Sequence, residues 1–440
     1  MHKNTVTSIL LALAACNAGA QTTFASVEDV WKYAETHNVS IGNASLEAQK
    51  AKRGTQQAYM AFLPSVNTSA NFTDNTTIQT TLIPAVMFGG PDGVYKPVQF
   101  GQKYSYNAGI TAQLDLVNLQ TWHNARIAHE TEAVNQAQVA NTRRNTYQQL
   151  AGQYYACLLN KEALRLANRS AAVADSMVTA VTNKFNEGTV NQPNLDNAKL
   201  NSERAHQTVV TASYQYRTSL NSLRSLLGFE LSDSLLIAGD LKPGQKPAFT
   251  GFTEDPSVSL AYHQSQLNLD KLKASDAGVF PTLSLQYSTN TQQFDNTFRP
   301  FDAAGPQWYK ANFWTLKASW AIFNGGNRWL QSQRNKISYQ QANADLEQAR
   351  RQSVITDENL RLSYNKAAEL LTRAQNIMDL SYDNYRHTTL RYEEGIASLE
   401  DRLRAFSDFI NYQNQYLNSL SEMLIQSYNI KIRQQTFRYE

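Results

Sequence analysis

Residues 104–118, YSYNAGITAQLDLVN, alternate between two kinds of side chain along their whole length. One set is aromatic and aliphatic: Tyr104, Tyr106, Ala108, Ile110, Ala112, Leu114 and Leu116. The other is small and polar: Ser105, Asn107, Gly109, Thr111, Gln113 and Asp115. A half-buried strand is usually about 5 or 6 residues long, whereas a tilted strand that crosses a bilayer needs about 9 to 11. This stretch is long enough to cross a membrane.

Similar alternation recurs, and the sequence predicts four membrane-crossing strands, over about 65–80, 104–117, 281–291 and 312–323. The strands of each pair are separated by polar loops with glycine and proline, 83–103 and 291–311. Outer-membrane barrels carry long loops of this kind on their outer side. Because a membrane barrel needs about eight strands or more, four strands predict an oligomer.

The size of the oligomer follows from the interior that it must enclose. Two chains would supply eight strands, a barrel that side chains fill, whereas three would supply twelve and leave an open lumen. The wet set of strand residues includes Gln113, Asp115 and Lys317, which we expect to line this barrel lumen. The strand count therefore favours a homotrimer.

Two very long helices follow the strand pairs, over about 119–187 and 327–394, since these stretches lack proline and contain only one glycine, Gly152. Return helices are expected over 191–227 and 397–430. Spacings of three and four predict coiled-coil seams: Ala133, Ala137, Ala140, Arg144, Tyr147, Ala151, Tyr154 and Leu158, then Tyr364, Ala367, Leu371, Ala374, Met378, Ser381 and Tyr385. Arg144 fits its seam only if its stem packs there while its charged head reaches water.

The chain contains an internal duplication. Its halves correspond at the proline before the first strand, Pro64 or Pro281, and at the ends of the long helices, KFNEG (184–188) and RYEEG (391–395). A period of about 200 residues indicates a duplicated domain rather than a solenoid. The repeats are expected over 21–227 and 256–430, with an equatorial linker at 228–255 and a C-terminal tail at 431–440. Each repeat reads as helix, strand, strand, long helix and helix.

The N-terminus has the features of an export signal. Lys3 precedes an apolar stretch, 6–15, and Ala18-Gly19-Ala20 forms a small-x-small cleavage site. Residues 1–20 are therefore expected to be a cleaved signal peptide. The segment Leu13-Ala14-Ala15-Cys16 also resembles a lipobox, in which Cys16 would be lipidated. Cleavage after Ala20 is preferred because the apolar core before the cysteine is short.

Composition and motif content argue against several other functions. The 440-residue chain has a net charge of +3, with basic residues dispersed among nearly as many acids, which argues against a nucleic-acid partner. Cys157 is the only cysteine besides Cys16, so no intrachain disulfide is expected after export. Nucleotide-binding, hydrolase and metalloprotease motifs do not occur, and the histidines lack metal-ligand spacing. The sequence predicts no enzyme, no cofactor and no metal site.

Together these features resemble the TolC family of outer-membrane efflux proteins. The family's turn pattern, an aromatic residue and glycine followed by Asp, Leu and Ala, is matched at the second tip by Tyr392, Gly395, Asp401, Leu403 and Ala405. The first tip matches at Phe185, Gly188 and Ala198, but Asn194 stands where the second repeat has aspartate. The resemblance covers essentially the whole exported chain.

The resemblance implies a mixed α and transmembrane β fold. Three copies would form a 12-stranded β-barrel in the lipid of the outer membrane of a Gram-negative bacterium, continued by a long α-helical barrel in the periplasm. The implied function is the exit duct of a tripartite efflux or type I secretion system, which conducts substrates passively. The implied partners are a periplasmic membrane-fusion adaptor and an inner-membrane pump of RND or ABC type. We expect the adaptor to contact the tip, at Gly188, Thr189, Gly395 and Ile396.

An acidic pair suggests a periplasmic gate. Asp379 and Asp383 lie four residues apart on one helix face, so three copies would gather six carboxylates near the narrow end of the tunnel. Arg386 and Arg391 are close enough to hold this region shut through ion pairs. An ordinary solvated helix face would explain the same acids.

A different class of protein shares part of this pattern. A periplasmic coiled-coil adaptor or structural spacer would have the export signal and the helical seams. It would have no use for strands with one wet and one apolar face, so the exit duct is the preferred interpretation.

Overall fold

The computed structural model describes residues 22–244, 246–249, 252–299 and 306–435. The first half contains β1 (Thr22–Phe24), α2 (Val27–His37), α3 (Val39–Met60), β2 (Ser65–Asp74), β3 (Thr80–Pro84), the 3-10 helix η2 (Ala85–Phe88), β4 (Tyr95–Gln99), β5 (Tyr104–Val117), α4 (Leu119–Asn186) and α5 (Gln192–Leu227). The second half contains β6 (Leu235–Ile237), α6 (Pro256–Ala277), β7 (Thr282–Asp295), β8 (Tyr309–Ser319), α7 (Asn327–Glu393) and α8 (Leu399–Gln434). The expected signal peptide, with Cys16, lies outside the described residues.

The chain packs as two compact units, and each unit takes segments from both halves of the sequence. One unit comprises the described residues up to Gln49, 133–263 and those from Ala344 onward. The other comprises 50–132 and 264–343. Each of the two predicted repeats therefore contributes to both units.

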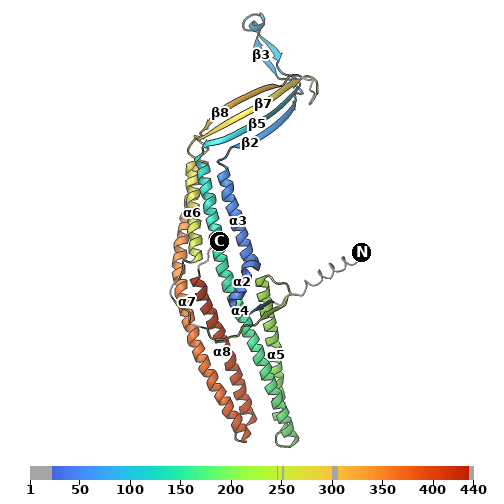
Figure 1. The fold of residues 1–440 in the computed structure, drawn as a ribbon, viewed down its shortest axis with the longest axis vertical. Helices are drawn as coiled ribbons and strands as arrows, with labels where there is room; N and C mark the ends of the chain where they lie inside the picture. The colour runs from blue at the N-terminus through green and yellow to red at the C-terminus, as the bar shows by residue number, and fades with distance from the viewer. Residues whose placement is uncertain (1–21, 245, 250–251, 300–305, 436–440) are drawn as a thin grey trace, which may run out of the picture. The chain divides into compact units, whose positions relative to one another are not determined.

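Four antiparallel strands form the sheet of the second unit, in the order β2-β5-β7-β8 (Figure 1). The 14-residue strand β5 pairs with β7 along its length, from Tyr104 opposite Asp295 to Val117 opposite Leu283, with a bulge after Asp115. Such a long ladder forms because the period-2 alternation of β5 is uninterrupted. Among the described residues, β2 and β8 each pair on one side only, so the sheet has two open edges.

Three expected strand boundaries are wrong, and each is set by a pairing partner. β2 stops at Asp74 rather than near residue 80 because its partner β5 begins at Tyr104, which lies opposite Asp74. β7 runs on to Asp295 because β5 offers it partners that far. β8 covers 309–319 rather than 312–323, since Ser319 pairs with Thr282, the first residue of β7.

The segment expected to be a polar loop at 83–103 is largely a structured ribbon. β3 and β4 pair from Thr80 opposite Gln99 to Pro84 opposite Tyr95, and η2 lies at the closed end. The glycines that suggested a loop belong to its tight turn, with φ of 73° at Gly89 and 79° at Gly93. A left-handed backbone favours glycine there.

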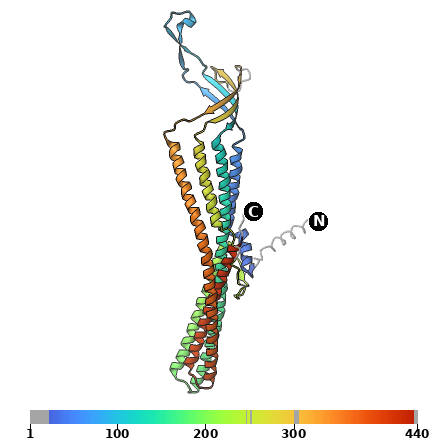
Figure 2. The same cartoon turned by 90° about the vertical axis from the view of Figure 1, so that its left-hand side faces the viewer.

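The first unit contains two helical hairpins, α4 with α5 and α7 with α8, whose turns lie at the same end (Figures 1 and 2). Its core gathers apolar residues from β1, β6 and five helices, and it includes Ala151, Tyr154 and Leu158 of the predicted α4 seam. Trp31 of α2 stacks on Tyr147 of α4, with 4.9 Å between ring centroids, and donates its Nε1–H to the Tyr147 carbonyl at 3.2 Å. None of the helices among the described residues is both long and apolar enough to cross a membrane.

Candidate functional site

Both helical hairpins of the first unit reverse at a glycine with a left-handed backbone. Gly188 has φ of 73° and Gly395 has φ of 76°. After α4, Thr189 N donates to the Lys184 carbonyl at 2.9 Å, and after α7, Ile396 N donates to the Arg391 carbonyl at 2.8 Å. These bonds satisfy carbonyls that a helix end otherwise leaves unpaired. An added Cβ would meet nothing within 4 Å at either glycine, so backbone conformation, not space, requires glycine.

The return helices start from different caps, which explains where the two tips differ in sequence. Ser398 caps α8 in a reciprocal capping box, in which Asp401 N donates to Ser398 Oγ at 3.1 Å and Ser398 N donates to Asp401 Oδ2 at 3.1 Å. The Ser398 hydroxyl also donates to Asp401 Oδ2 at 2.6 Å, and this bond, followed by the one from Ser398 N, holds the pKa of Asp401 below its usual range. In the first hairpin the Asn191 side chain accepts from Asn194 N at 3.2 Å. Asn191 thus has the N-cap role in α5 that Ser398 has in α8, and this cap does not require a carboxylate at position 194.

A tyrosine between two cations joins the two tips. The Lys184 ammonium lies 4.6 Å from the centre of the Tyr392 ring and 3.2 Å from its hydroxyl. The Arg402 guanidinium lies 5.2 Å from the same ring centre. Leu399 also packs on a small apolar cluster of Val181, Leu195 and Ala198 near the first tip. Side-chain contacts therefore hold the two hairpins together at their turns.

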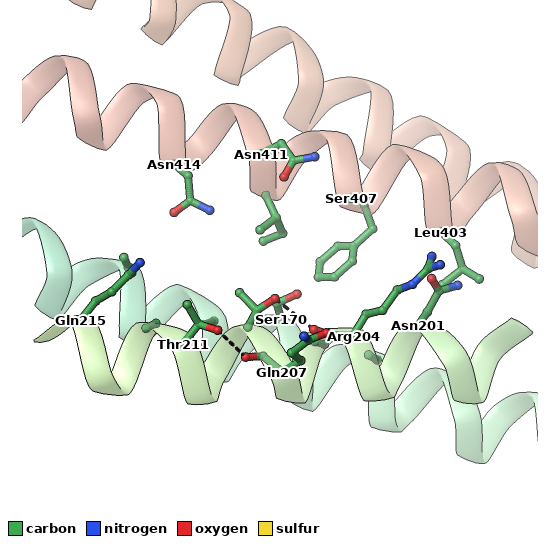
Figure 3. Close-up of a pocket in the computed structure, with 18 of the residues that line it drawn as sticks. Ser170, Asn201, Arg204, Gln207, Thr211, Gln215, Leu403, Ser407, Asn411 and Asn414 are labelled. Carbon is green, nitrogen blue, oxygen red and sulfur yellow. Dashed lines mark hydrogen bonds between the residues drawn. The ribbon is translucent and has the colours of Figure 1, made fainter.

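A polar groove runs along the hairpins above the tips. It has a volume of about 590 Å³ and lies between the α4–α5 hairpin and α8 (Figure 3). Hydroxyl and amide side chains predominate among its polar lining residues, and Arg204 is the one charged residue among the described lining residues. Phe406 and Ile410 of α8 contribute apolar side chains to its lining. No local sequence pattern indicates this groove, because its lining residues come from three helices.

Beside this groove, an exposed carboxylate of α4, Asp175, is hydrogen-bonded to two side chains of α5. Ser202 Oγ donates to Asp175 Oδ1 at 2.6 Å, and His206 Nε2 lies 3.1 Å from the same oxygen. The hydrogen bond from Ser202, followed by that from His206, lowers the pKa of Asp175.

In the half of the sheet that joins the helices, one face is wet and the other is apolar, whereas farther along Thr289 and Gln293 of β7 share the face of Ile110 and Tyr106. One row in register contains Ser65, Gln113, Gln286 and Thr315, and the next contains Leu114, Leu285 and Leu316. Asp115 and Lys317 both pair with Ser284, so Gln113, Asp115 and Lys317 share the wet face. The strand period thus brings together the residues expected to line a lumen.

Comparison with known proteins identifies this combination of a two-faced sheet and long helical hairpins. Residues 31–229 and 253–431 match the sequence profile described as "Outer membrane efflux protein". The chain belongs to the outer membrane efflux protein family. The resemblance to the TolC family is thereby confirmed. As a member of this family the chain is located in the outer membrane and extends into the periplasm.

Solved structures of distant relatives share the fold. The outer membrane protein VceC of Vibrio cholerae superposes with a TM-score of 0.76 at 14% identity, covering 94% of this chain and 97% of VceC. The CmeC outer membrane channel of Campylobacter jejuni gives 0.73 at 14%, covering 94% and 86%. The open-state MtrE outer membrane channel of Neisseria gonorrhoeae gives 0.73 at 17%, covering 93% and 88%. No curated protein sequence matches the chain significantly.

The other expected site residues of this efflux-family chain are found on exposed surfaces. Thr189 and Ile396 follow the two tip glycines, and Ile396 is 63% exposed. Asp379, Asp383, Arg386 and Arg391 are exposed on α7, where Asp383 and Arg386 form an ion pair at 3.7 Å. In the described part of the chain, no three His, Cys, Asp or Glu side chains are grouped as metal ligands would be.

Sequence reasoning missed a buried cluster of charges in the first unit. Arg433, near the end of α8, is 6% exposed and contacts Asp357 of α7 at 2.7 Å and Asp255 at 3.8 Å. Arg144 of α4 pairs with Asp255 as well, and its side chain is only 16% exposed, so its charged head fits the seam through a buried partner and not chiefly through water. Burial alone would raise the pKa of Asp255, but hydrogen bonds from Ser257 and the two guanidinium groups outweigh it and lower the pKa.

Proposed function

We propose that this chain is the outer-membrane exit duct of a tripartite efflux or type I secretion system, through which substrates pass passively. The observation that carries the proposal is the sheet with two open edges, β2 and β8, and two chemically different faces. Four strands are too few to close a membrane barrel, and three copies would supply twelve. The apolar face then meets lipid, and the face with Gln113, Asp115 and Lys317 lines the lumen.

The first measurement is the native mass of the protein extracted from outer membranes in detergent, with bound detergent subtracted. We expect the mass of three chains. A monomer or dimer in that measurement would overturn the 12-stranded barrel and with it the open duct.

We place the adaptor contact at the tip, on Gly188, Thr189, Gly395 and Ile396. All four are exposed, and the two turns that carry them are joined through Tyr392. The polar groove of Figure 3 lies on the same hairpins and gives a helical partner room to extend along them. The partners are then a periplasmic membrane-fusion adaptor and, through it, an inner-membrane pump of RND or ABC type.

Asparagine tolerates a left-handed backbone, so Gly188→Asn combined with Gly395→Asn keeps both turns and adds only side chains at the tip. We expect this variant to assemble normally and to lose pump-dependent efflux. The matched control is Gly152→Asn in α4, where an added Cβ also meets nothing within 4 Å. Efflux that survives in the double variant would remove the glycines from the contact.

We also place the periplasmic gate on Asp379, Asp383, Arg386 and Arg391, with Tyr392 and its two cations next to it. The ion pair of Asp383 and Arg386 lies within one helix and leaves both side chains more than half exposed. These charges are therefore available to neighbouring copies in a trimer.

The alternative, a periplasmic adaptor or spacer, lacks a specific observation in its favour. The helical seams fit it, but the wet and apolar rows of the sheet do not, and the family assignment is to efflux proteins of the outer membrane.

A further inference from the structure

The ribbon β3–η2–β4 carries an exposed apolar surface that the proposed duct does not use. We define the knuckle as Leu82, Val86, Met87, Phe88 and Tyr95, whose side chains are between 51% and 75% exposed. Between residues 80 and 99 the charged residues are Asp92 and Lys96, which cancel. A cluster of large apolar side chains on a surface usually marks an interaction site.

The knuckle is preformed by backbone hydrogen bonds. Ala85 N donates to the Val94 carbonyl at 2.7 Å, and Gly90 N donates to the Ala85 carbonyl at 2.9 Å. Ala85 is fully buried, and a Cβ at Gly90 would lie 2.9 Å from the Ala85 Cβ. Because the backbone is already ordered, binding through this surface would lose little conformational entropy.

The ribbon stands at the end of the sheet opposite the helices. It connects the end of β2, an edge strand, to the start of β5, whereas α3, α4, α6 and α7 all join the strands at their other ends. Figure 1 shows it projecting beyond the strands. With the helices on the periplasmic side, this end faces the outside of the cell.

The ribbon is unsuited to recognition by strand addition. Pro84 and Pro97 occupy its two strands, and proline has no N–H to offer an incoming strand. A partner must therefore bind through side chains, and the apolar knuckle is the surface available.

We propose that the knuckles of three copies meet on the axis of the barrel and cover its outer mouth. This inference rests on the proposed trimer. Twelve strands about 4.8 Å apart and tilted by about 40° give a barrel radius of about 12 Å. Five paired residues span about 17 Å, so each ribbon is long enough to reach the axis from the rim.

Identical knuckles suit one another because they carry no charge that would repel a like surface. Threefold symmetry presents the same residues to each other at equal distances. The cover is held by side-chain packing alone, so outgoing cargo can displace it without breaking any strand pairing.

The test uses cysteine cross-linking in outer-membrane vesicles of the full-length protein. Met87→Cys places a thiol on the knuckle, at a side chain that is 75% exposed and hence tolerant of change. Lys96→Cys is the matched control, because Lys96 pairs with Ile83 and faces away from Leu82 and Tyr95. Native Cys157 is fully buried, and burial raises the pKa of its thiol to about 11, which keeps it out of the reaction.

With a short three-armed maleimide, we expect Met87→Cys to yield covalent trimer on the order of tenfold more than Lys96→Cys, since held thiols react at a high effective concentration. Native mass is measured on the same sample. A trimer in which the two variants cross-link equally poorly overturns the cover, with lipid or an external protein then on the knuckle, and leaves the duct standing. A sample that is not trimeric overturns the duct itself.

Discussion

Arg433 shows how one side chain can hold several segments of the chain together. Its guanidinium donates to Asp357 of α7 and to the Thr253 carbonyl of the linker, while Asp255 is shared with Arg144 of α4. Charges at this depth must be paired, because an isolated one would lose its hydration without compensation.

Replacing Arg433 with methionine removes the cation that pairs with Asp357, whose side chain is 21% exposed, and leaves the buried Asp255 with Arg144 alone. We expect Arg433→Met to cost about 3–5 kcal/mol of unfolding free energy. The exposed pair of Arg404 and Glu400 supplies the control, and Arg404→Met should cost less than about 1 kcal/mol. Thermal unfolding followed by circular dichroism measures both.

A further variant isolates the physical cause. If the unpaired carboxylate of Asp357 is what destabilises Arg433→Met, adding Asp357→Asn should restore part of the loss. Additive losses in the double variant would show that packing, and not charge, is the main contribution of Arg433.

The capping box of α8 predicts a pH dependence at the second tip. Asp401 has a lowered pKa in the folded chain, so its contribution is present above the unfolded pKa of about 3.9 and is lost as pH falls through the folded value. We expect amide exchange at residues 398–402 to accelerate below about pH 4 relative to the first tip. The variant Asp401→Ala should show fast exchange already at neutral pH, and a protected tip in that variant would contradict the assignment.

At the scale of elements, the strand period decides which face each residue takes. Leu316 pairs with Leu285 on the apolar face, while its neighbour Thr315 pairs with Gln286 on the wet face. The two positions are adjacent in sequence and differ mainly in the face that they occupy, so one can serve as the control for a substitution at the other.

Arginine on a lipid-facing strand costs about 2–4 kcal/mol near the middle of a bilayer, whereas a lumen position tolerates it. We expect Leu316→Arg to lower the yield of folded, heat-modifiable protein in outer membranes severalfold, with Thr315→Arg close to the parent. Equal losses in the two variants would mean that the face with Leu316 does not meet lipid.

The elements also show what a sequence can and cannot predict. The alternation of β5 and the proline-free stretches of α4 and α7 are local patterns, and both produced elements of the expected kind. The partner of Arg144 is 111 residues away, so no local pattern could indicate it. The ends of β2, β7 and β8 depend on where their partner strands begin and end. The ribbon at 80–99 contains glycine and proline, which are typical of a loop in sequence.

At the scale of the whole molecule, the prediction concerns ion selectivity. Three copies would bring Asp379 and Asp383 to the narrow end of the duct, where carboxylates attract cations. We expect Asp379→Asn with Asp383→Asn to reduce the preference for cations over anions severalfold in planar bilayers. Asp196→Asn with Glu203→Gln removes the same charge from α5 and should change it little. Unchanged selectivity after the first pair would exclude these acids from the gate.

The open edges of the sheet have a consequence for the life of the protein before assembly. A freshly exported chain presents two rows of unpaired backbone groups, on β2 and β8, and any other strand can add to them. Each chain is thus prone to aggregation and proteolysis until neighbours cover both edges. The interval between export and assembly becomes the vulnerable period, and overproduction should be limited by the rate at which chains find one another, not by the rate of synthesis.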